Sequence, residues 1–286
     1  MRIKKALITS KSIAAALPYV KEAAAFLSSH NVKTFCPPEK AKFFDGIEEI
    51  VPFKGSYATL DAAIAFGGDG TILKAARLLL GSDAPILGVN MGTVGYLTDV
   101  EPVDTLSAVK QLLSGDFKTE KRSALRITSG GKTFVGVNEA VIYRGSLSHI
   151  LTLNVKINGQ NVETLRADGI IISTPTGSTA YNLSAGGPIV EPLSKTFVVT
   201  PICAHSLTAR PLVIGDESEI VLTVSNFRSE REKPSLDIDG KTVMRLDENA
   251  TVELKLAREK IVLARTKPTN FYLAIQKKLS AAGIIE

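Results

Sequence analysis

A run of glycines around one aspartate, Gly67-Gly68-Asp69-Gly70-Thr71, lies where an apolar run ends and a helical pattern begins. Glycines let a ligand come close to main-chain N–H groups, and a helix start adds exposed donors and partial positive charge that suit a phosphate. The charge of Asp69 would repel a phosphate, so Asp69 fits this loop if it binds a metal or accepts a proton from an attacking hydroxyl. A tight turn after a strand is the alternative. No GxxxxGK[ST] motif occurs, so this is not a Walker P-loop.

Two further segments combine glycine with polar or aromatic side chains. Residues 90–97 (NMGTVGYL) follow the next apolar run, and the ends of adjacent parallel strands form the usual ligand crevice of an open α/β sheet. Residues 168–181 (DGIIISTPTGSTAY) join three isoleucines to a hydroxyl-rich turn, and 184–188 (SAGGP) follow. The hydroxyls offer donors and acceptors for sugar and amide groups, and Tyr181 offers a face for stacking a base. A plain loop is the alternative for each segment.

Three polar residues lie outside these segments. Asn138 and Glu139 stand between apolar strand residues, where burial is costly unless their polar atoms are satisfied. An edge-strand pair facing water explains them equally well. His205 is a structural or a catalytic histidine. With three histidines in the chain and no Ser-His-Asp pattern, hydrolase and zinc chemistry are poor interpretations.

The first hundred residues alternate short apolar runs with helical patterns. Strands are predicted at 6–9, 32–36, 62–66 and 85–90, and helices at 12–29 and 72–80, with Ser10 as the N-cap of the first. Such alternation predicts an open, Rossmann-like parallel sheet with helices on its faces.

After a helical stretch at about 103–114, the hydrophobic period changes from 3.6 to 2. Alternating residues at 151–157, 220–224 and 252–256, with hairpin signals at Asn158-Gly159 and Asp239-Gly240, predict a β-rich domain, a β-sandwich. We expect an α/β domain over 1–103 and a β-rich domain over 104–267. A helix over 271–282, within a C-terminal segment 268–286, is expected to return to the first domain.

Bulk composition is ordinary. The chain has 286 residues, 44% hydrophobic and 22% charged, with a net charge of +5, which excludes disordered and fibrous classes. Only two cysteines, Cys36 and Cys203, occur, which suits a reducing cytoplasm and is too few for a zinc cage. The sequence has no apolar run of about 18 residues and no basic run with interleaved aromatics. We therefore expect a cytoplasmic protein without membrane or nucleic-acid partners.

Together these motifs resemble the NAD kinase family. GGDGT, NMGTVGYL, the Asn-Glu pair, DGIIISTPTGSTAY with SAGGP, and PICAHSLTARPLV at 201–213 stand in the family's order and spacing. GGDG also occurs in lipid kinases and phosphofructokinases, so STPTGSTAY is the specific part. The resemblance covers about residues 60–215 with motifs. This chain has Tyr96 where the family often has Phe, and Ala204 where it usually has Pro.

The resemblance implies a kinase that phosphorylates the adenosine-ribose 2′-hydroxyl of NAD. It implies ATP or another donor, Mg²⁺ or another divalent cation, and a homo-oligomer, dimer or tetramer, in which a neighbouring subunit borders the NAD site. Asp69 would be the catalytic residue, and no side chains are assigned as metal ligands. The phosphate loop would comprise Gly67, Gly68, Gly70 and Thr71. NAD binding is implied for Asp69, Gly70, Tyr96, Asn138, Glu139, Asp168, Thr176, Thr179, Ala180, Tyr181 and Ser184.

Within that set, Tyr96 would wall the adenine pocket, and the Asn138-Glu139 pair would bind adenosine-side groups and ribose hydroxyls. Asp168 would contact the nicotinamide end, and Tyr181 would stack. Because a neutral hydroxyl is a poor nucleophile, a carboxylate such as Asp69 that accepts its proton lowers the barrier. Two alternatives remain: a lipid kinase with the same nucleotide loop, and a dinucleotide sensor without turnover.

Overall fold

The computed structural model describes residues 3–92, 95–146, 150–227, 232–268 and 270–282. They form two compact units: unit 1 comprises the residues up to Lys121 and from Lys260 onward, and unit 2 spans Arg122–Glu259. The sequence-based boundaries at 103/104 and 267/268 differ from these, because the segment after residue 103 and a strand before residue 267 both belong to the sheet and helices of unit 1.

Unit 1 is built on a seven-stranded sheet in the order β3-β2-β1-β4-β5-β19-β6. Neighbouring strands from β3 to β19 run parallel to one another. The strands are β1 (Lys5–Ser10), β2 (Lys33–Cys36), β3 (Ile50–Pro52), β4 (Ala62–Gly67), β5 (Ile86–Asn90), β6 (Lys118–Arg122) and β19 (Ile261–Arg265). All six residues of β4 are buried, which is typical of a parallel strand covered on both faces.

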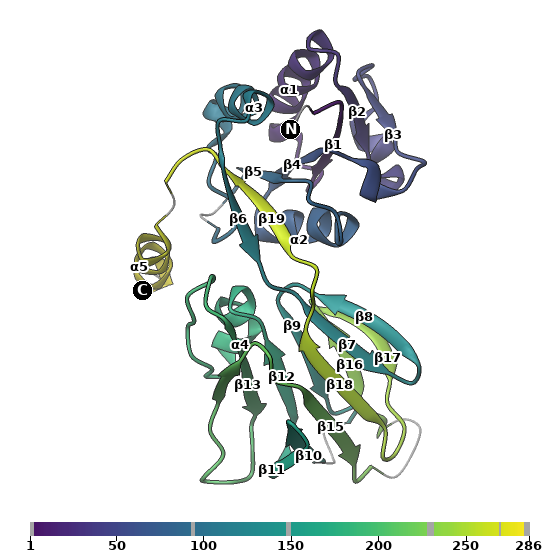
Figure 1. Cartoon of the computed structure of the whole chain (residues 1–286), viewed down its shortest axis with the longest axis vertical. Helices are drawn as coiled ribbons and strands as arrows, with labels where there is room; N and C mark the ends of the chain where they lie inside the picture. Colours follow the sequence, from purple (N-terminus) through teal and green to yellow (C-terminus); the bar gives the residue numbers. More distant parts are fainter. Residues whose placement is uncertain (1–2, 93–94, 147–149, 228–231, 269, 283–286) are drawn as a thin grey trace. The chain divides into compact units, whose positions relative to one another are not determined.

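Helices cover both faces of this sheet (Figure 1). The helices on the sheet are α1 (Leu17–Ser29), α2 (Asp69–Leu78) and α3 (Thr105–Ser114), and α5 (Phe271–Ala282) is drawn apart from the sheet in Figure 1. Short 3₁₀ turns are η1 (Ala14–Ala16), η2 (Pro38–Phe44), η3 (Tyr57–Thr59) and η4 (Pro102–Asp104). α1 and α3 share one core with β1, β4 and β5, whereas α2 lies on the opposite face. The predicted parallel α/β domain is confirmed.

The start of the first helix differs from the prediction. Ser10 is the last residue of β1, and α1 begins at Leu17 without a side-chain cap. Pro18 stands in the first turn of α1, where its missing N–H costs nothing. A 3₁₀ turn over 14–16 therefore separates the strand from the helix.

Unit 2 contains two six-stranded antiparallel sheets. One has the order β11-β10-β15-β18-β7-β8 and the other β14-β13-β12-β9-β16-β17. The first comprises β7 (Leu125–Ser129), β8 (Lys132–Gly136), β10 (Leu151–Ile157), β11 (Gln160–Ala167), β15 (Ile220–Ser225) and β18 (Thr251–Leu256). The second comprises β9 (Glu139–Tyr143), β12 (Gly169–Ser173), β13 (Thr196–Ile202), β14 (Leu212–Gly215), β16 (Ser235–Ile238) and β17 (Lys241–Arg245).

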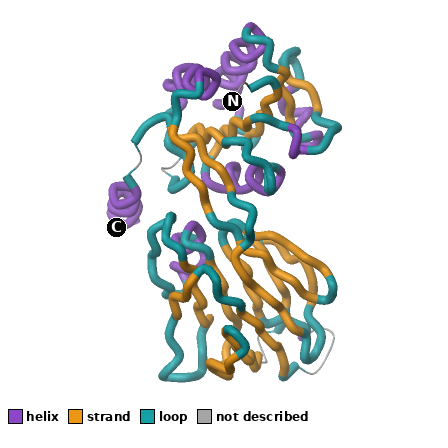
Figure 2. Tube along the Cα trace, in the orientation of Figure 1, coloured by secondary structure: helices purple, strands orange, loops and turns teal. Residues whose placement is uncertain are grey.

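One core fills the space between these sheets. It takes Leu153, Val155 and Leu222 from the first sheet, with Ile172 and Phe197 from the second, so the unit is a β-sandwich. The outer face of the second sheet bears η5 (Thr176–Thr179) and α4 (Tyr181–Ser184). The predicted antiparallel β-rich domain is confirmed, and Figure 2 shows how little helix this unit contains.

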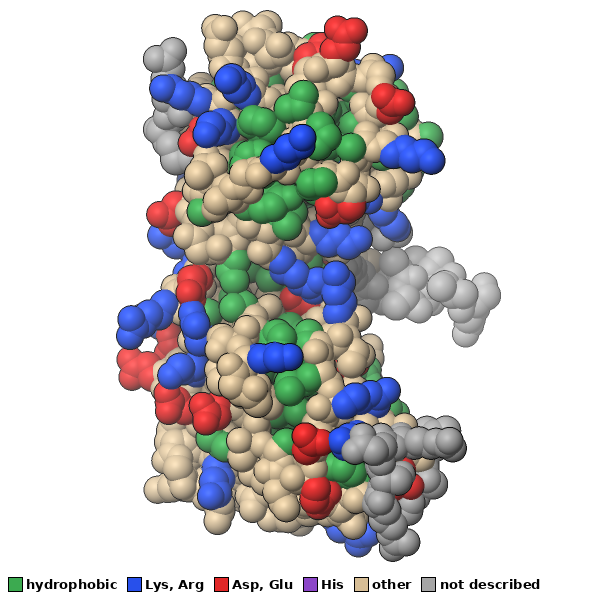
Figure 3. Space-filling view, turned by 90° about the vertical axis from the view of Figure 1, so that its right-hand side faces the viewer, with side chains coloured by type: hydrophobic (Ala, Val, Ile, Leu, Met, Phe, Trp, Pro, Cys, Tyr) green, Lys and Arg blue, Asp and Glu red, His purple; other side chains and the backbone are tan. Residues whose placement is uncertain are grey.

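Both predicted hairpin turns are present. The pairs Asn158-Gly159 and Asp239-Gly240 all have positive φ, as a two-residue type I′ turn requires. Among the described residues, no helix is long and apolar enough to cross a membrane. On the face shown in Figure 3, basic and acidic side chains are interspersed.

Candidate functional site

The Gly67–Thr71 segment forms the junction between β4 and α2. Gly67 ends the strand, Gly68 caps the helix, and Asp69 is its first residue. A Cβ on Gly67 would lie 2.1 Å from Oγ1 of the buried Thr71, so only glycine fits there. A Cβ on Gly68 or Gly70 would meet no described atom within 4 Å. Nothing inside the described protein therefore requires glycine at these two positions, whereas a ligand that approaches the backbone would.

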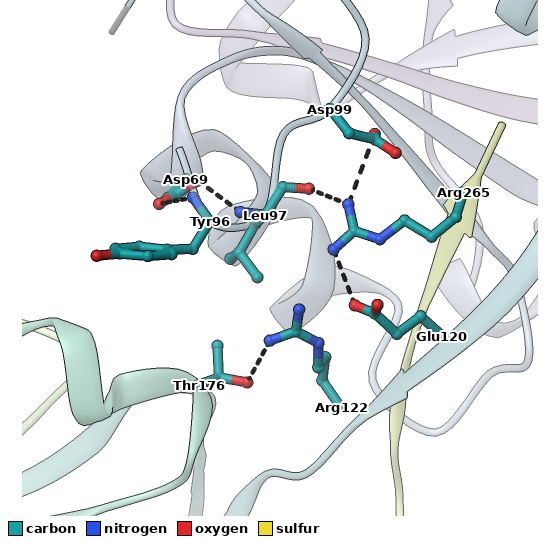
Figure 4. A network of polar contacts seen from close by, with 8 residues as sticks. All are labelled: Asp69, Tyr96, Leu97, Asp99, Glu120, Arg122, Thr176 and Arg265. Carbon is teal, nitrogen blue, oxygen red and sulfur yellow. Dashed lines mark hydrogen bonds and ion pairs between the residues drawn. The ribbon is translucent and has the colours of Figure 1, made fainter. Parts of the chain in front are cut away.

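The carboxylate of Asp69 is held by the backbone of the neighbouring loop. Its Oδ2 accepts the N–H of Tyr96 and its Oδ1 that of Leu97, each at 2.9 Å (Figure 4). Gly95 passes so close that a Cβ there would lie 2.1 Å from Oδ1 of Asp69. One bond to each oxygen fixes the orientation of the carboxylate.

The loop after β5 is thereby joined to the loop after β4. The N–H of Met91 donates to the carbonyl of Gly67 at 3.2 Å, and Asn90 is buried. Thr93 and Val94, within the predicted ligand segment, lie outside the described residues. Tyr96 is half-buried with its ring centroid 6.1 Å from that of Phe271. Burial first, and then the charge of Asp69, raise the pKa of the Tyr96 hydroxyl, which stays neutral at physiological pH.

In unit 2, Asn138 and Glu139 sit where β8 passes into β9, and a carboxylate holds their backbone. Asp239 accepts the N–H groups of Val137, Asn138 and Glu139 at 2.7–3.2 Å. Asp239 belongs to the hairpin between β16 and β17. Three successive N–H groups that converge on one anion fix this turn firmly. Glu139 is buried and Asn138 half-buried.

The hydroxyl-rich segment after β12 is packed against the same turn. The Thr174 Oγ1 donates to the carbonyl of Val137 at 2.7 Å and accepts the N–H of Gly177 at 3.1 Å. A Cβ on Gly177 would lie 2.1 Å from the carbonyl oxygen of Asn138, so glycine is required. The Ser178 hydroxyl donates to the carbonyl of Pro175 at 2.7 Å. Several hydroxyls expected to offer bonds to a ligand therefore hold the turn itself.

The predicted ligand residues in this segment differ in exposure. Thr176 is buried and accepts a hydrogen bond from Nη1 of the buried Arg122 at 3.2 Å (Figure 4). Thr179 and Ala180 are half-buried, Ser184 is exposed, and Tyr181 has 43% of its surface exposed. An exposed ring anchored on a packed turn is suited to stacking against a flat ligand.

Asp168 lies at the other end of β12. Its carboxylate forms an ion pair with Arg144 at 2.9 Å, and the side chains of Arg144 and Asp168 are 15% and 14% exposed. The charges of Tyr143, Cys203 and Asp168 contribute, after burial, to the raised pKa of Tyr181, which places Tyr181 near this end. At a strand rise of about 3.4 Å per residue, Asp168 and Thr174 are about 20 Å apart. The candidate residues of unit 2 thus follow an elongated track.

The structure brings the candidates together in two sets. In unit 1, the glycine loop, Asp69 and Tyr96 adjoin one another. In unit 2, the turn at Asn138 and Glu139 contacts Thr174 and Gly177, which flank Thr176, and Tyr181 lies toward Asp168. His205 is exposed, and its backbone N–H donates to the backbone carbonyl of Arg166 at 2.7 Å.

Sequence reasoning missed three residues that hold these sets. In the sequence, Asp239 is recognisable only as half of the Asp239-Gly240 turn signal, although an acid at that position can also accept hydrogen bonds. Arg122 and Arg144, which contact Thr176 and Asp168, carry no local signal because their partners are 54 and 24 positions away.

Comparison with known proteins identifies the family. Residues 17–117 match the ATP-NAD kinase N-terminal domain, and residues 137–266 match the C-terminal domain. The NAD kinase of Moorella thermoacetica is 37% identical over 274 residues, covering 93% of this chain and 87% of that protein. The NAD kinase of Methanothermobacter thermautotrophicus is 34% identical over 280 residues, covering 97% and 96%.

Solved structures agree. The yeast NADH kinase complexed with NADH has a TM-score of 0.87 and 26% identity, covering 98% of this chain and 88% of that one. An NAD kinase from Archaeoglobus fulgidus in complex with ATP has the same fold, with a TM-score of 0.74, 23% identity and coverage of 97% and 99%. The chain belongs to the ATP-NAD kinase family.

Proposed function

We propose that this kinase transfers the terminal phosphoryl group of ATP to the 2′-hydroxyl of the adenosine ribose of NAD, with Asp69 as the general base. Family membership supplies the reaction, the ATP-dependent phosphorylation of NAD to NADP. A bond forms between the ribose oxygen and the terminal phosphorus, the bond from that phosphorus to ADP breaks, and the hydroxyl proton is released. One observation carries the assignment of Asp69: its carboxylate is fixed by two backbone N–H groups at the start of α2.

The fixed carboxylate suits proton transfer. A carboxylate whose two oxygens are already oriented needs little rearrangement to accept a proton from a hydroxyl aligned with it. The Tyr96 and Leu97 N–H groups each bond to one oxygen of the carboxylate, so both oxygens are held in a defined direction at the start of α2. Asp69 therefore acts as a base whose orientation is set before the substrate arrives.

The donor phosphates fit the backbone beside Asp69. The first N–H groups of α2 point out of the helix, and Gly68 and Gly70 leave them uncovered by side chains. These amides would stabilise negative charge on the phosphoryl oxygens as it develops. We assign Gly67 and Thr71 to the shape of this loop, since Thr71 fills the space that a side chain at Gly67 would take.

The divalent cation is best treated as part of the donor. Mg²⁺ in nucleotide sites usually keeps its waters and binds substrate phosphates with one or two carboxylates. Among the described residues, no group of three or more His, Cys, Asp or Glu side chains could hold a metal ion. This arrangement fits Mg²⁺ that enters as its ATP complex. The backbone amides of the protein would then bind the phosphates.

The acceptor would lie along the track of unit 2. We assign adenosine-side groups and ribose hydroxyls to Asn138 and Glu139, and the nicotinamide end to Asp168. The wall between them would comprise Thr176, Thr179, Ala180, Tyr181 and Ser184, and Tyr96 would wall the adenine. Support comes from the length of the track, the exposed Tyr181 ring and the Arg144 ion pair that fixes Asp168.

We further propose a cytoplasmic homo-oligomer. Cys36 is buried and Cys203 exposed, and both are free thiols, which suits a reducing compartment. Size-exclusion chromatography with light scattering would test the assembly. A monomer at micromolar concentration would exclude it.

The test of the base is the Asp69→Asn variant. Turnover of NAD with ATP and Mg²⁺, followed by an NADP-specific dehydrogenase, should fall at least about 100-fold, with NAD binding largely retained. Asp61→Asn is the matched control, because Asp61 also accepts two backbone N–H groups, from Lys4 and Lys5. Turnover of Asp69→Asn within a few-fold of the parent would remove Asp69 from this role.

A further inference from the structure

A buried arginine from the last strand of unit 1 reaches the loop that holds Asp69. Arg265 ends β19, and its side chain is 6% exposed. Its Nη1 donates to the carbonyl of Leu97 at 2.8 Å, and its Nη2 donates to Oε1 of Glu120 at 2.8 Å (Figure 4). Its Nη1 also lies 3.5 Å from Oδ1 of Asp99. One guanidinium thus joins strands β19 and β6 to the loop after β5.

Leu97 is held from both sides. Its N–H donates to Oδ1 of Asp69, and its carbonyl accepts from Arg265. A residue bonded at both its amide and its carbonyl has little freedom to rotate, so the position of Arg265 is transmitted to the carboxylate of Asp69. The Gly95 backbone, which touches the same carboxylate, completes the enclosure.

The carboxylates around Arg265 keep it in place. The Glu120 and Asp99 side chains are 15% and 11% exposed, so their pairing with the guanidinium takes place largely away from water. The guanidinium is a rigid planar fork whose two terminal nitrogens serve different acceptors, the Leu97 carbonyl and Glu120, whereas a lysine would have to reach both from a single nitrogen. Arginine is therefore the residue type that this arrangement requires.

We propose that Arg265, anchored by Glu120 and Asp99, is a positioning residue that fixes the loop of residues 95–98 and, through it, the orientation of Asp69. The expected effect of Arg265 on turnover rests on the proposed role of Asp69 as the base. The expected effect of Arg265 on the order of the loop does not. The residue touches no reacting group and acts only through Leu97.

The primary test is amide hydrogen exchange in the full chain carrying Arg265→Lys. The Tyr96 and Leu97 amide protons should exchange at least about tenfold faster, because the loop loses its anchor. Arg126→Lys is the matched control: it alters another arginine–glutamate pair, with Glu259 at 2.6 Å, in unit 2. Unchanged exchange at Tyr96 and Leu97 in a folded Arg265→Lys protein would overturn the proposal, whatever the activity.

Kinetics separate positioning from general structural support. The kcat of Arg265→Lys should fall about tenfold or more, while KM for ATP and NAD changes by less than about threefold. In an Asp69→Asn background, the same substitution should change the residual kcat by less than about twofold, since both act through one carboxylate. An equal loss in both backgrounds would overturn the route through Asp69, and parent-like kcat with faster exchange would show that the anchoring is not used in turnover.

A failure of the proposed role of Asp69 can be distinguished from a failure of the proposed role of Arg265. If Asp69→Asn alone keeps parent turnover, Asp69 is not the base, and the exchange rates still decide whether Arg265 holds the loop. If Arg265→Lys does not fold, Glu120→Gln takes its place, because it retains an acceptor for Nη2 but removes the charge. Exchange at Leu97 should then rise about threefold or more, and an unchanged rate would refute the proposal.

Discussion

A methyl group at residue 95 has no room beside the carboxylate on which the proposed reaction depends. A Cβ on Gly95 would lie 2.1 Å from Oδ1 of Asp69 and 2.7 Å from Oγ1 of Thr98. Carbon and oxygen in contact lie about 3.3 Å apart, so the carboxylate or the loop must move by roughly 1.2 Å, the difference of 3.3 and 2.1. Because Asp69 is also bonded to Tyr96 and Leu97 at 2.9 Å, either movement disturbs those bonds.

That displacement sets the expected loss of activity for Gly95→Ala. Misplacement of a catalytic group by about 1 Å can reduce turnover about 100-fold, which is about 2.7 kcal/mol at 1.36 kcal/mol per factor of ten. The KM for ATP should change little, because the Gly68 and Gly70 amides lie on α2 and are not displaced. Crowding of this kind lowers the free energy of unfolding by about 1–3 kcal/mol, so the protein should still fold.

The assay is steady-state formation of NADP by Gly95→Ala, with Gly215→Ala as the control. Gly215 ends β14 in unit 2, and a Cβ there would meet no described atom within 4 Å. The control should retain parent kcat and melting temperature. A kcat within about threefold of the parent for Gly95→Ala would mean that the position of this carboxylate is not critical, and the argument from its confinement would be wrong.

Three further predictions follow from single contacts. Asp239→Asn keeps a residue that tolerates positive φ but removes the negative charge that accepts three backbone N–H groups. The free energy of unfolding should fall by about 2 kcal/mol, which lowers the melting temperature by about 4–8 °C, and KM for NAD should rise. An unchanged thermal scan would refute this. Gly70→Ala should leave the melting temperature unchanged, because a Cβ there meets no described atom, yet raise KM for ATP; equal KM values would show that no phosphate approaches this backbone. Burial is the largest cause that raises the pKa of Asp99, so its ionised form opposes folding at neutral pH. Asp99→Asn removes this pH-dependent cost and also weakens the anchor of Arg265, so the stability of the variant relative to the parent should be higher at pH 7–8 than below about pH 4; thermal scans across pH would contradict this if the difference shifted the other way.

The elements that sequence predicted best are those with local signals. The alternation at 151–157 and the Asn158-Gly159 turn fix β10 and its hairpin with β11, since period and turn type act over a few residues. The continuous apolar run of β4 likewise predicts a buried parallel strand. These features need no knowledge of distant parts of the chain.

The features that sequence did not predict depend on distant partners. The strand Ile261–Arg265 pairs with β5 in the first sheet, although some 170 residues separate them, and nothing in its five residues marks that return. The same holds for Asp239, whose carboxylate meets N–H groups about 100 positions away. A local pattern shows that a residue can accept hydrogen bonds, but only the fold determines which donor groups reach it.

The sequence also does not distinguish hydroxyls that can bind a ligand from hydroxyls that hold a turn together. Composition alone makes each Ser and Thr of 173–179 an equal candidate, yet the Thr174 and Ser178 hydroxyls bond to the carbonyls of Val137 and Pro175. Buried hydroxyls must form hydrogen bonds within the protein. In a buried turn they therefore bond to nearby backbone groups and are not available to a ligand. The exposure of Tyr181, by contrast, leaves its ring accessible to a ligand.

Gly95 and Arg265 act on the same short loop from opposite sides, and this has a consequence for their combined effect. Gly95→Ala would push the loop away from Asp69, and Arg265→Lys would release it from β19; either change frees the Leu97 N–H from its bond to Oδ1. Once that bond is lost, a second cause of its loss adds little, so the two reductions in kcat should combine to much less than their product. If the double variant instead shows the full product of roughly 100-fold and tenfold, the two residues control catalysis independently, and a single loop cannot be what orients the carboxylate.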